Sequence, residues 1–154
     1  MILPVDFYRR PTLDVARNLL YVATGDNYTE PDTRLSDAVI AINRTTGRVV
    51  WSRQLTENDV YNGSCAAKPA DCGPDFDFGQ SPILGRAPDG RELLLIGQKS
   101  GIVWALDPTK QGAVVWQTRV GVGGTNGGVQ WGMASDGERV FATVSDVKRV
   151  PNTN

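Results

Sequence analysis

The sequence predicts an all-β protein built from repeated units of antiparallel strands. The apolar segments are short and rich in β-branched residues, and Gly, Asp or Pro bounds each of them. No stretch of ten or more residues places its apolar positions at helical spacing. The 17 glycines and nine prolines together make up about one residue in six, above the ordinary share of about 12%. This favours many short elements joined by turns.

The strand pattern occurs twice and then begins a third time. The first copy has expected strands at residues 19–25, 37–43 and 49–51, and the second has them at 93–97, 101–107 and 112–116. The third copy opens at 139–144. Leu95 and Phe141 hold the same place in successive copies and lie 46 positions apart, which fits a four-stranded propeller blade of about 40–50 residues.

The first interval is longer than the second. Tyr21 and Leu95 lie 74 positions apart, and the extra residues fall in two expected loops, 26–36 and 57–80. Long loops without strands of their own are usually functional or disordered, so both loops are candidates for a functional site.

The turn before the last strand of each copy has a pattern of its own. Residues 41–51 read A-x-N-x-x-T-G-x-x-x-W, and residues 105–116 repeat this with one additional residue. Asn or Asp can hold such a turn through its own backbone, and Gly supplies a positive φ. The Trp side chain provides a large apolar face for the neighbouring blade. Two copies in the same place of the repeat indicate a repeated propeller blade.

Composition excludes several kinds of site. The chain of 154 residues contains no histidine, so it cannot by itself assemble a Ser-His-Asp or Cys-His nucleophile or a His-ligated zinc or haem. Sixteen Lys and Arg against 17 Asp and Glu give a net charge of −1, which offers no electrostatic reason to expect nucleic acid or an anionic membrane as a partner. No apolar run approaches a membrane span, and the first residues lack the pattern of a signal peptide.

The two cysteines lie close together in the second long loop. Six residues separate Cys65 from Cys72, in a segment rich in Asn, Gly, Pro and Asp. This spacing is compatible with a local disulfide, which suits an oxidising compartment, and with two free thiols. A glycine-rich segment, 121–128, is not a phosphate loop, because no Lys-Ser/Thr and no expected helix follow it.

From about Arg10 onward the sequence resembles the pyrroloquinoline quinone (PQQ)-dependent alcohol dehydrogenases, and looks most like their polyvinyl-alcohol dehydrogenase branch. The phrases that carry this resemblance are LLYVATGDNY (19–28), DFDFGQSPIL (75–84), GQKSG (97–101) and GGVQWG (127–132), together with the two Trp turns, which resemble the tryptophan-docking repeat of quinoproteins. The resemblance implies an eight-bladed propeller with PQQ and calcium at its axis. Residues 10–154 would then be about two and a half blades, whereas residues 1–9 match poorly.

The resemblance also implies an activity. Such enzymes oxidise an alcohol and pass the electrons to an acceptor such as a cytochrome c or a quinone, in the periplasm or outside the cell. We expect the chain to be a fragment of such an enzyme, inactive in isolation, because the ring, the first calcium-ligating Glu and the aromatic that stacks on PQQ are missing from it. The alternative is a non-catalytic propeller that serves as a scaffold for protein interactions. Asp75, Lys99 and Asp26 would converge around an axial cavity in the enzyme, whereas a scaffold would have its carboxylates scattered over the rim.

The resemblance assigns roles to particular residues. Asp75 lies seven residues before Pro82 and would be the general base, with Asp77 as the alternative two residues further on. A competing register, residues 59–62, would place Asn62 at the critical position, where it could not act as a base. Asp26 stands where the family has a calcium-ligating Asn, and Asp26 and Asp75 would hold the metal through carboxylate oxygens.

Three further residues would bind the cofactor. Lys99 stands where a cation contacts the quinone oxygens, and Gln130 and Trp131 align with a segment that lies near PQQ. From the residues alone, each assignment has a structural alternative. Asp26 could simply follow a strand in a turn, Lys99 could be a solvated hairpin residue, and Trp131 could be a core aromatic.

Overall fold

The computed structural model describes residues 10–145, and these form three antiparallel sheets. The poorly matching segment, residues 1–9, lies outside the described residues. So do residues 146–154, the end of the expected propeller domain. The first sheet contains β1 (Thr12–Asp14), β2 (Leu19–Ala23), β3 (Ala38–Asn43) and β4 (Val49–Gln54). The second contains β5 (Ile83–Arg86), β6 (Glu92–Gly97), β7 (Ile102–Asp107) and β8 (Ala113–Arg119). In each sheet the strands lie side by side in chain order.

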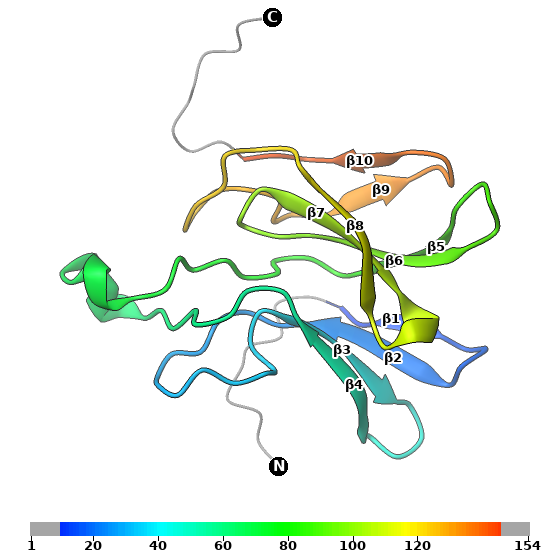
Figure 1. The fold of residues 1–154 in the computed structure, drawn as a ribbon, viewed down its shortest axis with the longest axis horizontal. Helices are drawn as coiled ribbons and strands as arrows, with labels where there is room; N and C mark the ends of the chain where they lie inside the picture. The colour runs from blue at the N-terminus through cyan, green and yellow to red at the C-terminus, as the bar shows by residue number, and fades with distance from the viewer. Residues whose placement is uncertain (1–9, 146–154) are drawn as a thin grey trace, which may run out of the picture.

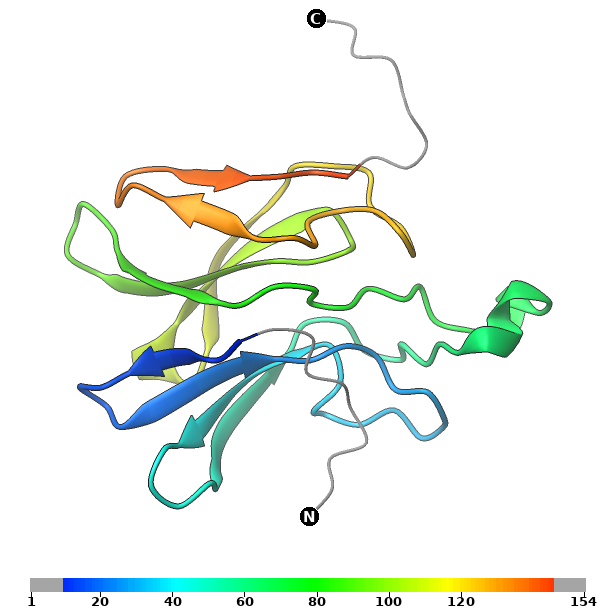
Figure 2. The same ribbon diagram turned by 180° about the vertical axis from the view of Figure 1, so that it is seen from behind.

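The third sheet is a hairpin of β9 (Met133–Ser135) and β10 (Val140–Ala142). Figures 1 and 2 show the three sheets stacked one on another, like successive blades of an open propeller. The predicted all-β partial propeller is therefore confirmed, with two four-stranded blades and the first two strands of a third. Among the described residues, no helix is long and apolar enough to cross a membrane.

The repeat is visible in the strand register. The pairing of β3 with β4 shifts between Ala41 and Ile42, and the pairing of β7 with β8 shifts between Ala105 and Leu106. In both sheets the residue just before the shift pairs with the Trp of the turn motif, Trp51 or Trp116. The two copies of the motif thus build the same bulged hairpin.

The Asn or Asp of each motif organises its turn as expected. Asn43 Oδ1 accepts hydrogen bonds from the backbone N–H groups of Thr45 and Thr46, at 3.1 and 2.9 Å. Asp107 Oδ1 accepts one from Thr109 N, at 2.8 Å, and the additional residue of this copy is accommodated in the short 3₁₀ helix η3 (Pro108–Lys110).

The main hydrophobic core lies between the first two sheets. It joins buried residues of β2, β3 and β4 to residues of β6 and β7 and to Phe78, which precedes β5. Trp51 reaches from the first sheet to the β7–β8 turn of the second, where Arg53 Nε also donates to the carbonyl of Gly112 at 3.1 Å. A smaller core between the second sheet and the β9–β10 hairpin includes Leu93, Leu95 and Trp116.

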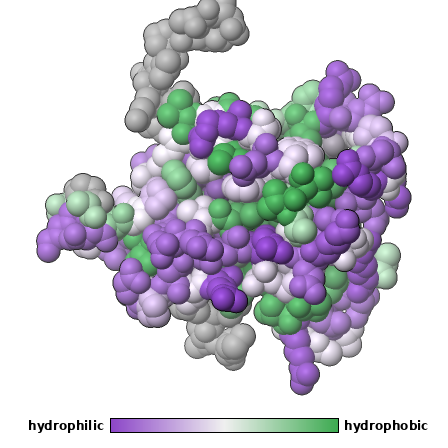
Figure 3. Space-filling view, viewed as in Figure 1, coloured by the Kyte–Doolittle hydropathy of each residue, from purple (hydrophilic) through white to green (hydrophobic). Residues whose placement is uncertain are grey.

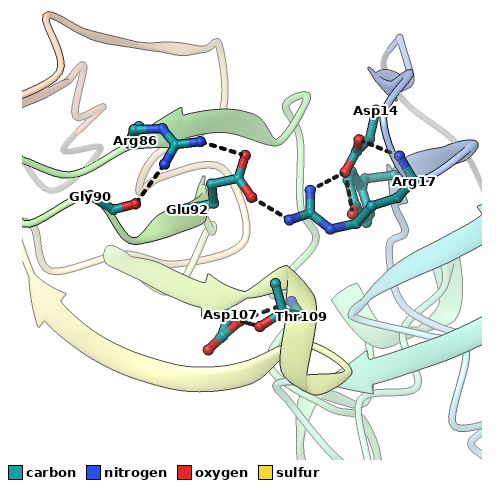
Figure 4. Close-up of polar contacts among 8 residues, drawn as sticks. Asp14, Arg17, Arg86, Gly90, Glu92, Asp107 and Thr109 are labelled. Carbon is teal, nitrogen blue, oxygen red and sulfur yellow. Dashed lines mark hydrogen bonds and ion pairs between the residues drawn. The ribbon is translucent and has the colours of Figure 1, made fainter.

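An ion-pair network also joins the first two sheets, between the β1–β2 turn and β6 (Figure 4). Arg17, in the β1–β2 turn, donates to Asp14 Oδ2 at 2.7 Å and also to Glu92 of β6. Asp14 is buried and accepts a further hydrogen bond from the hydroxyl of Tyr21, at 2.9 Å. Because Arg17 bonds to one carboxylate in each sheet, it links the two blades directly.

The second long loop forms an arm that extends from one end of the stacked sheets (Figures 1 and 2). It contains two 3₁₀ helices, η1 (Gly63–Ala66) and η2 (Pro69–Asp71). Cys65 and Cys72 form a disulfide, with an S–S distance of 2.01 Å. The disulfide therefore closes the outer part of the arm.

Much of the visible surface in Figure 3 is hydrophilic, interrupted by apolar patches. Large apolar side chains are exposed on the last strand of each sheet, namely Val50 on β4, Val114 on β8 and Phe141 on β10. Stacked blades ordinarily protect their edges by closing into a ring. The described sheets do not close, which agrees with a partial propeller.

Candidate active site

Three aspartates and a lysine meet at the end of the sheets from which the arm extends. Asp26 follows β2, Asp75 and Asp77 lie in the returning part of the arm before β5, and Lys99 lies in the turn between β6 and β7. Lys99 Nζ contacts Asp75 Oδ1 at 2.6 Å and Asp77 Oδ2 at 2.7 Å. All four residues are buried, with exposed fractions of 5–8%. We call them the Asp–Lys cluster.

Backbone hydrogen bonds hold the segments of the cluster together. The N–H of Asp26 donates to Asp77 Oδ1 at 2.9 Å, and the N–H of Lys99 donates to the carbonyl of Asp77 at 3.0 Å. The arm contributes as well, because Tyr61 N donates to Asp26 Oδ2 at 3.0 Å. Asp77 thereby connects the end of β2 in the first sheet to the β6–β7 turn in the second.

The charges of the cluster are strongly coupled. Burial lowers the pKa of Lys99, but the hydrogen bonds to Asp75 and Asp77 outweigh it, so the pKa lies above its ordinary value. Burial likewise opposes ionisation of Asp77, yet hydrogen bonds from Asp26 and Lys99 bring its pKa below the usual range. Lys99 and Asp77 therefore both favour their charged forms.

The other two carboxyls are held closer to their neutral forms. Burial, followed by the carboxylates of Asp77 and Asp75, raises the pKa of Asp26 to about 8. Burial also raises the pKa of Asp75, to about 6, although Lys99 opposes this shift. One lysine thus leaves three neighbouring carboxyls short of positive charge, and a bound cation would relieve that deficit.

The same carboxyls have the geometry of a cation site. One oxygen from each of Asp26, Asp75 and Asp77 lies within 4.8 Å of the others. Carboxylate oxygens are the donors that calcium prefers. The residues present therefore fit a hard divalent cation held by two of the predicted residues, Asp26 and Asp75, together with Asp77.

A hollow of about 220 Å³ opens beside the cluster. Asp77 and Lys99 line one part of it, and Gln130 and Trp131 line another, so the predicted cofactor-binding residues lie around one cavity. Trp131 is 70% exposed and lies outside the two hydrophobic cores of the described sheets. Gln130 is held by a hydrogen bond from its Nε2 to the carbonyl of Gly127, at 2.7 Å.

Sequence reasoning missed three residues of this hollow, Gly79, Thr125 and Asn126. Thr125 and Asn126 lie in the glycine-rich segment, which follows β8 and packs back onto the Lys99 turn. Gly124 N donates to the carbonyl of Lys99, and Val129 N donates to that of Gln98, each at 3.0 Å. The unusual density of glycines was the available signal that this loop approaches another backbone closely.

The competing register does not bring Asn62 to the cluster. The Asn62 side chain caps η1 by accepting from Ser64 N at 2.9 Å, and it donates to the carbonyl of Tyr28 at 2.9 Å. Its neighbour Tyr61 makes the backbone contact to Asp26. Asp59, at the start of that register, is fully buried and accepts hydrogen bonds from the backbone of Asp75 and Phe76.

The comparisons with known proteins agree on one family. Residues 9–119 match the β-propeller domain of glucose, ethanol and alcohol dehydrogenases that use PQQ. The chain is 47% identical over 140 residues to a polyvinylalcohol dehydrogenase of a Pseudomonas species, and 43% identical over 144 residues to one of a Sphingopyxis species. Each alignment covers 89% of this chain and 22% of the relative, so the chain spans about a fifth of their length.

Solved structures show the same fold. A quinohemoprotein alcohol dehydrogenase of Comamonas testosteroni superposes with a TM-score of 0.54 at 20% identity, over 87% of this chain and 19% of that one. One of Pseudomonas putida superposes with a TM-score of 0.56 at 21% identity, over the same shares. With the family match covering most of its length, the chain belongs to the PQQ-dependent dehydrogenases with a β-propeller domain.

Proposed function

We propose that this chain is part of the catalytic region of a PQQ- and calcium-dependent quinoprotein that oxidises an alcohol. The observation that carries the proposal is the convergence of Asp26, Asp75, Asp77 and Lys99 beside a hollow lined by Gln130 and Trp131. A propeller used only as a scaffold would have no reason to bury three carboxylates around one lysine, because burying charge is costly unless a function requires it.

In this proposal Asp75 accepts the proton of the substrate hydroxyl. Both oxygens of Asp77 are engaged, one by Asp26 N and one by Lys99 Nζ. Within the described part of the chain, Asp75 accepts a side-chain hydrogen bond from Lys99 at Oδ1. Asp77 is thus the more fully engaged carboxylate, which favours Asp75 as the base.

The remaining residues would hold and polarise the cofactors. Asp26 and Asp75 would bind calcium, and Lys99 would place its ammonium against the quinone oxygens, with Gln130 and Trp131 along the side of the hollow. PQQ, when bound, supplies the acceptor for the two electrons and the hydrogen of the substrate carbon. A cytochrome c or a quinone would then take the electrons away.

The names of the relatives support a proposal for the substrate class. Both curated relatives are named for polyvinyl alcohol, a polymer of secondary alcohols, so we propose a secondary alcohol as the substrate. The disulfide suits an oxidising compartment, which supports a periplasmic or secreted location.

The test uses a chimera, because the chain covers only part of its relatives. These residues replace the matching segment of the Pseudomonas polyvinylalcohol dehydrogenase, and dye-linked alcohol oxidation is measured with PQQ and calcium. We expect Asp75→Asn to abolish turnover without unfolding the chimera, while Asp71→Asn, an exposed carboxylate on the same arm, leaves turnover unchanged. Full turnover of Asp75→Asn would refute the assignment of the base.

A further inference from the structure

Asp59 is a fully buried carboxylate at the base of the arm, and it lies outside the Asp–Lys cluster. Its Oδ1 accepts the backbone N–H of Asp75 at 2.9 Å, and its Oδ2 accepts the backbone N–H of Phe76 at 2.7 Å. A carboxylate that accepts backbone N–H groups forms charge-assisted bonds, which are stronger and shorter than neutral ones. Asp59 therefore holds two successive peptide groups with one side chain.

The segment that Asp59 holds has an unusual backbone. Asp75 has a φ of +60°, in the left-handed region that ordinary residues rarely adopt. Such a conformation persists only where the surroundings over-determine it. The bonds from Asp59 lie on the N–H groups on either side of the Asp75 Cα, so they fix the direction in which the Asp75 side chain leaves the backbone.

That direction determines the contact with Lys99. Asp75 Oδ1 lies 2.6 Å from Lys99 Nζ, and both side chains are buried. No regular strand or helix supports Asp75, because it lies in the irregular segment between η2 and β5. Without the Asp59 carboxylate, the left-handed backbone at Asp75 would lose the hydrogen bonds of the Asp75 and Phe76 N–H groups.

The arm places Asp59 by close packing and backbone pairing. The N–H of Gly73 donates to the carbonyl of Val60 at 2.9 Å, so the outgoing part of the arm lies against the returning part. A Cβ atom at Gly73 would lie 2.7 Å from Val60 N and closer still to Asp59, so no larger residue fits there. Cys65 and Cys72 close the arm beyond this contact.

We propose that Asp59 is a positioning residue for Asp75: it touches neither substrate nor cofactor, and holds the left-handed backbone that presents the Asp75 carboxylate to Lys99. The inference rests on the proposed function insofar as Asp75 is the base. It adds that the arm has a catalytic purpose, since it carries the residue that orients the base.

The test compares Asp59→Asn with Asp136→Asn in the same chimera. Asp136 is the control, because its Oδ1 alone accepts two successive backbone N–H groups, those of Glu138 and Arg139, in an exposed turn of the third sheet, so an Asn there can keep both bonds. An Asn at position 59 keeps one acceptor oxygen and turns an N–H₂ group toward a backbone N–H. We expect kcat to fall by roughly 10–100-fold in Asp59→Asn, with KM within about twofold, the size seen when a supporting residue behind an active-site ligand is lost. Asp136→Asn should change neither constant.

Two measurements on the 154-residue chain need no turnover. In wild type, the amide protons of Asp75 and Phe76 should exchange slowly although they lie outside the strands, and in Asp59→Asn both amide resonances should move upfield. Fast exchange of both amides in wild type would overturn the proposal even if Asp59→Asn did not fold.

The kinetic outcomes separate the two proposals. An unchanged kcat in Asp59→Asn, or equal losses in Asp59→Asn and Asp136→Asn, would show that Asp59 does not position the base. Full activity of Asp75→Asn would instead overturn the role of Asp75, whatever the amide measurements give.

Discussion

Replacing Gly112 by Ala should measure how tightly the first two blades are docked. Gly112 lies in the β7–β8 turn with a φ of +68°, and a Cβ atom there would lie 2.7 Å from Cζ3 and 3.1 Å from Cη2 of Trp51. Gly47 lies in the corresponding β3–β4 turn with the same φ of +68°, but nothing lies within 4 Å of its Cβ position. The two glycines thus share a backbone conformation and differ in whether a neighbouring blade covers them.

The expected magnitudes follow from that difference. An Ala in the left-handed region costs about 1 kcal/mol, and this applies to both positions. Ala has less conformational freedom than Gly in the unfolded chain, which offsets part of this destabilisation. The offset is similar at the two positions, so it cancels when they are compared. Only Gly112→Ala also forces Trp51 to move, and overpacking of this kind costs about 1–3 kcal/mol. Gly112→Ala should therefore destabilise the chain by about 1–3 kcal/mol more than Gly47→Ala does.

Equilibrium unfolding in urea provides the assay, with the free energy of unfolding taken from the midpoint and the slope m. The slope should stay the same in both variants, since neither changes the surface exposed on unfolding. Equal losses of stability at the two glycines would show that Trp51 is not docked on this turn, and the account of the blade interface would then be wrong.

Two further predictions concern Asp37 and the disulfide of the arm. Burial, followed by the charges of Asp59 and Asp77, raises the pKa of Asp37 to about 9. The folded state therefore keeps a proton that the unfolded state releases. The free energy of unfolding should fall as pH rises from about 4 to 9, by up to about 1.4 kcal/mol per pH unit. Asp37→Asn should gain stability over wild type between about pH 5 and 8 in urea unfolding; parallel curves would contradict this. Replacing Cys65 and Cys72 by Ser should remove about 2 kcal/mol of loop constraint and speed proteolysis of the arm, as reductant should for wild type; equal cleavage rates would count against it.

The repeat made much of the fold predictable from the sequence. Apolar runs and turn residues located the central strands and both Trp turns. The first strands of the three sheets, β1, β5 and β9, were not identified, because these segments have three or four residues and mixed polarity. They become strands by pairing with β2, β6 and β10 across short hairpins, and the propensity of such short segments does not encode that pairing.

The candidate site was predictable only in its parts. The residue types suggested Asp26, Asp75 and Lys99, but a turn residue and a hairpin residue look the same in sequence whether they are solvated or buried. Lys99 does lie in a hairpin turn, yet it is only 8% exposed because the glycine-rich segment packs over that turn. Asp59 attracted notice only as part of a competing register, since nothing local shows that its partners lie 16 and 17 positions further on.

The blade interface and the Asp–Lys cluster are parts of one arrangement. Asp26 follows a strand of the first sheet and Lys99 follows a strand of the second, and Asp77 bonds to the backbone of both. The separation of the two sheets therefore sets whether Asp77 can reach both partners at once. Trp51 and Arg53 fix that separation at the β7–β8 turn, and Arg17 fixes it where it bridges Asp14 and Glu92. A tightly docked interface is thus a condition for the cluster, because a shift of about 1 Å between blades would break hydrogen bonds of 2.6–3.0 Å.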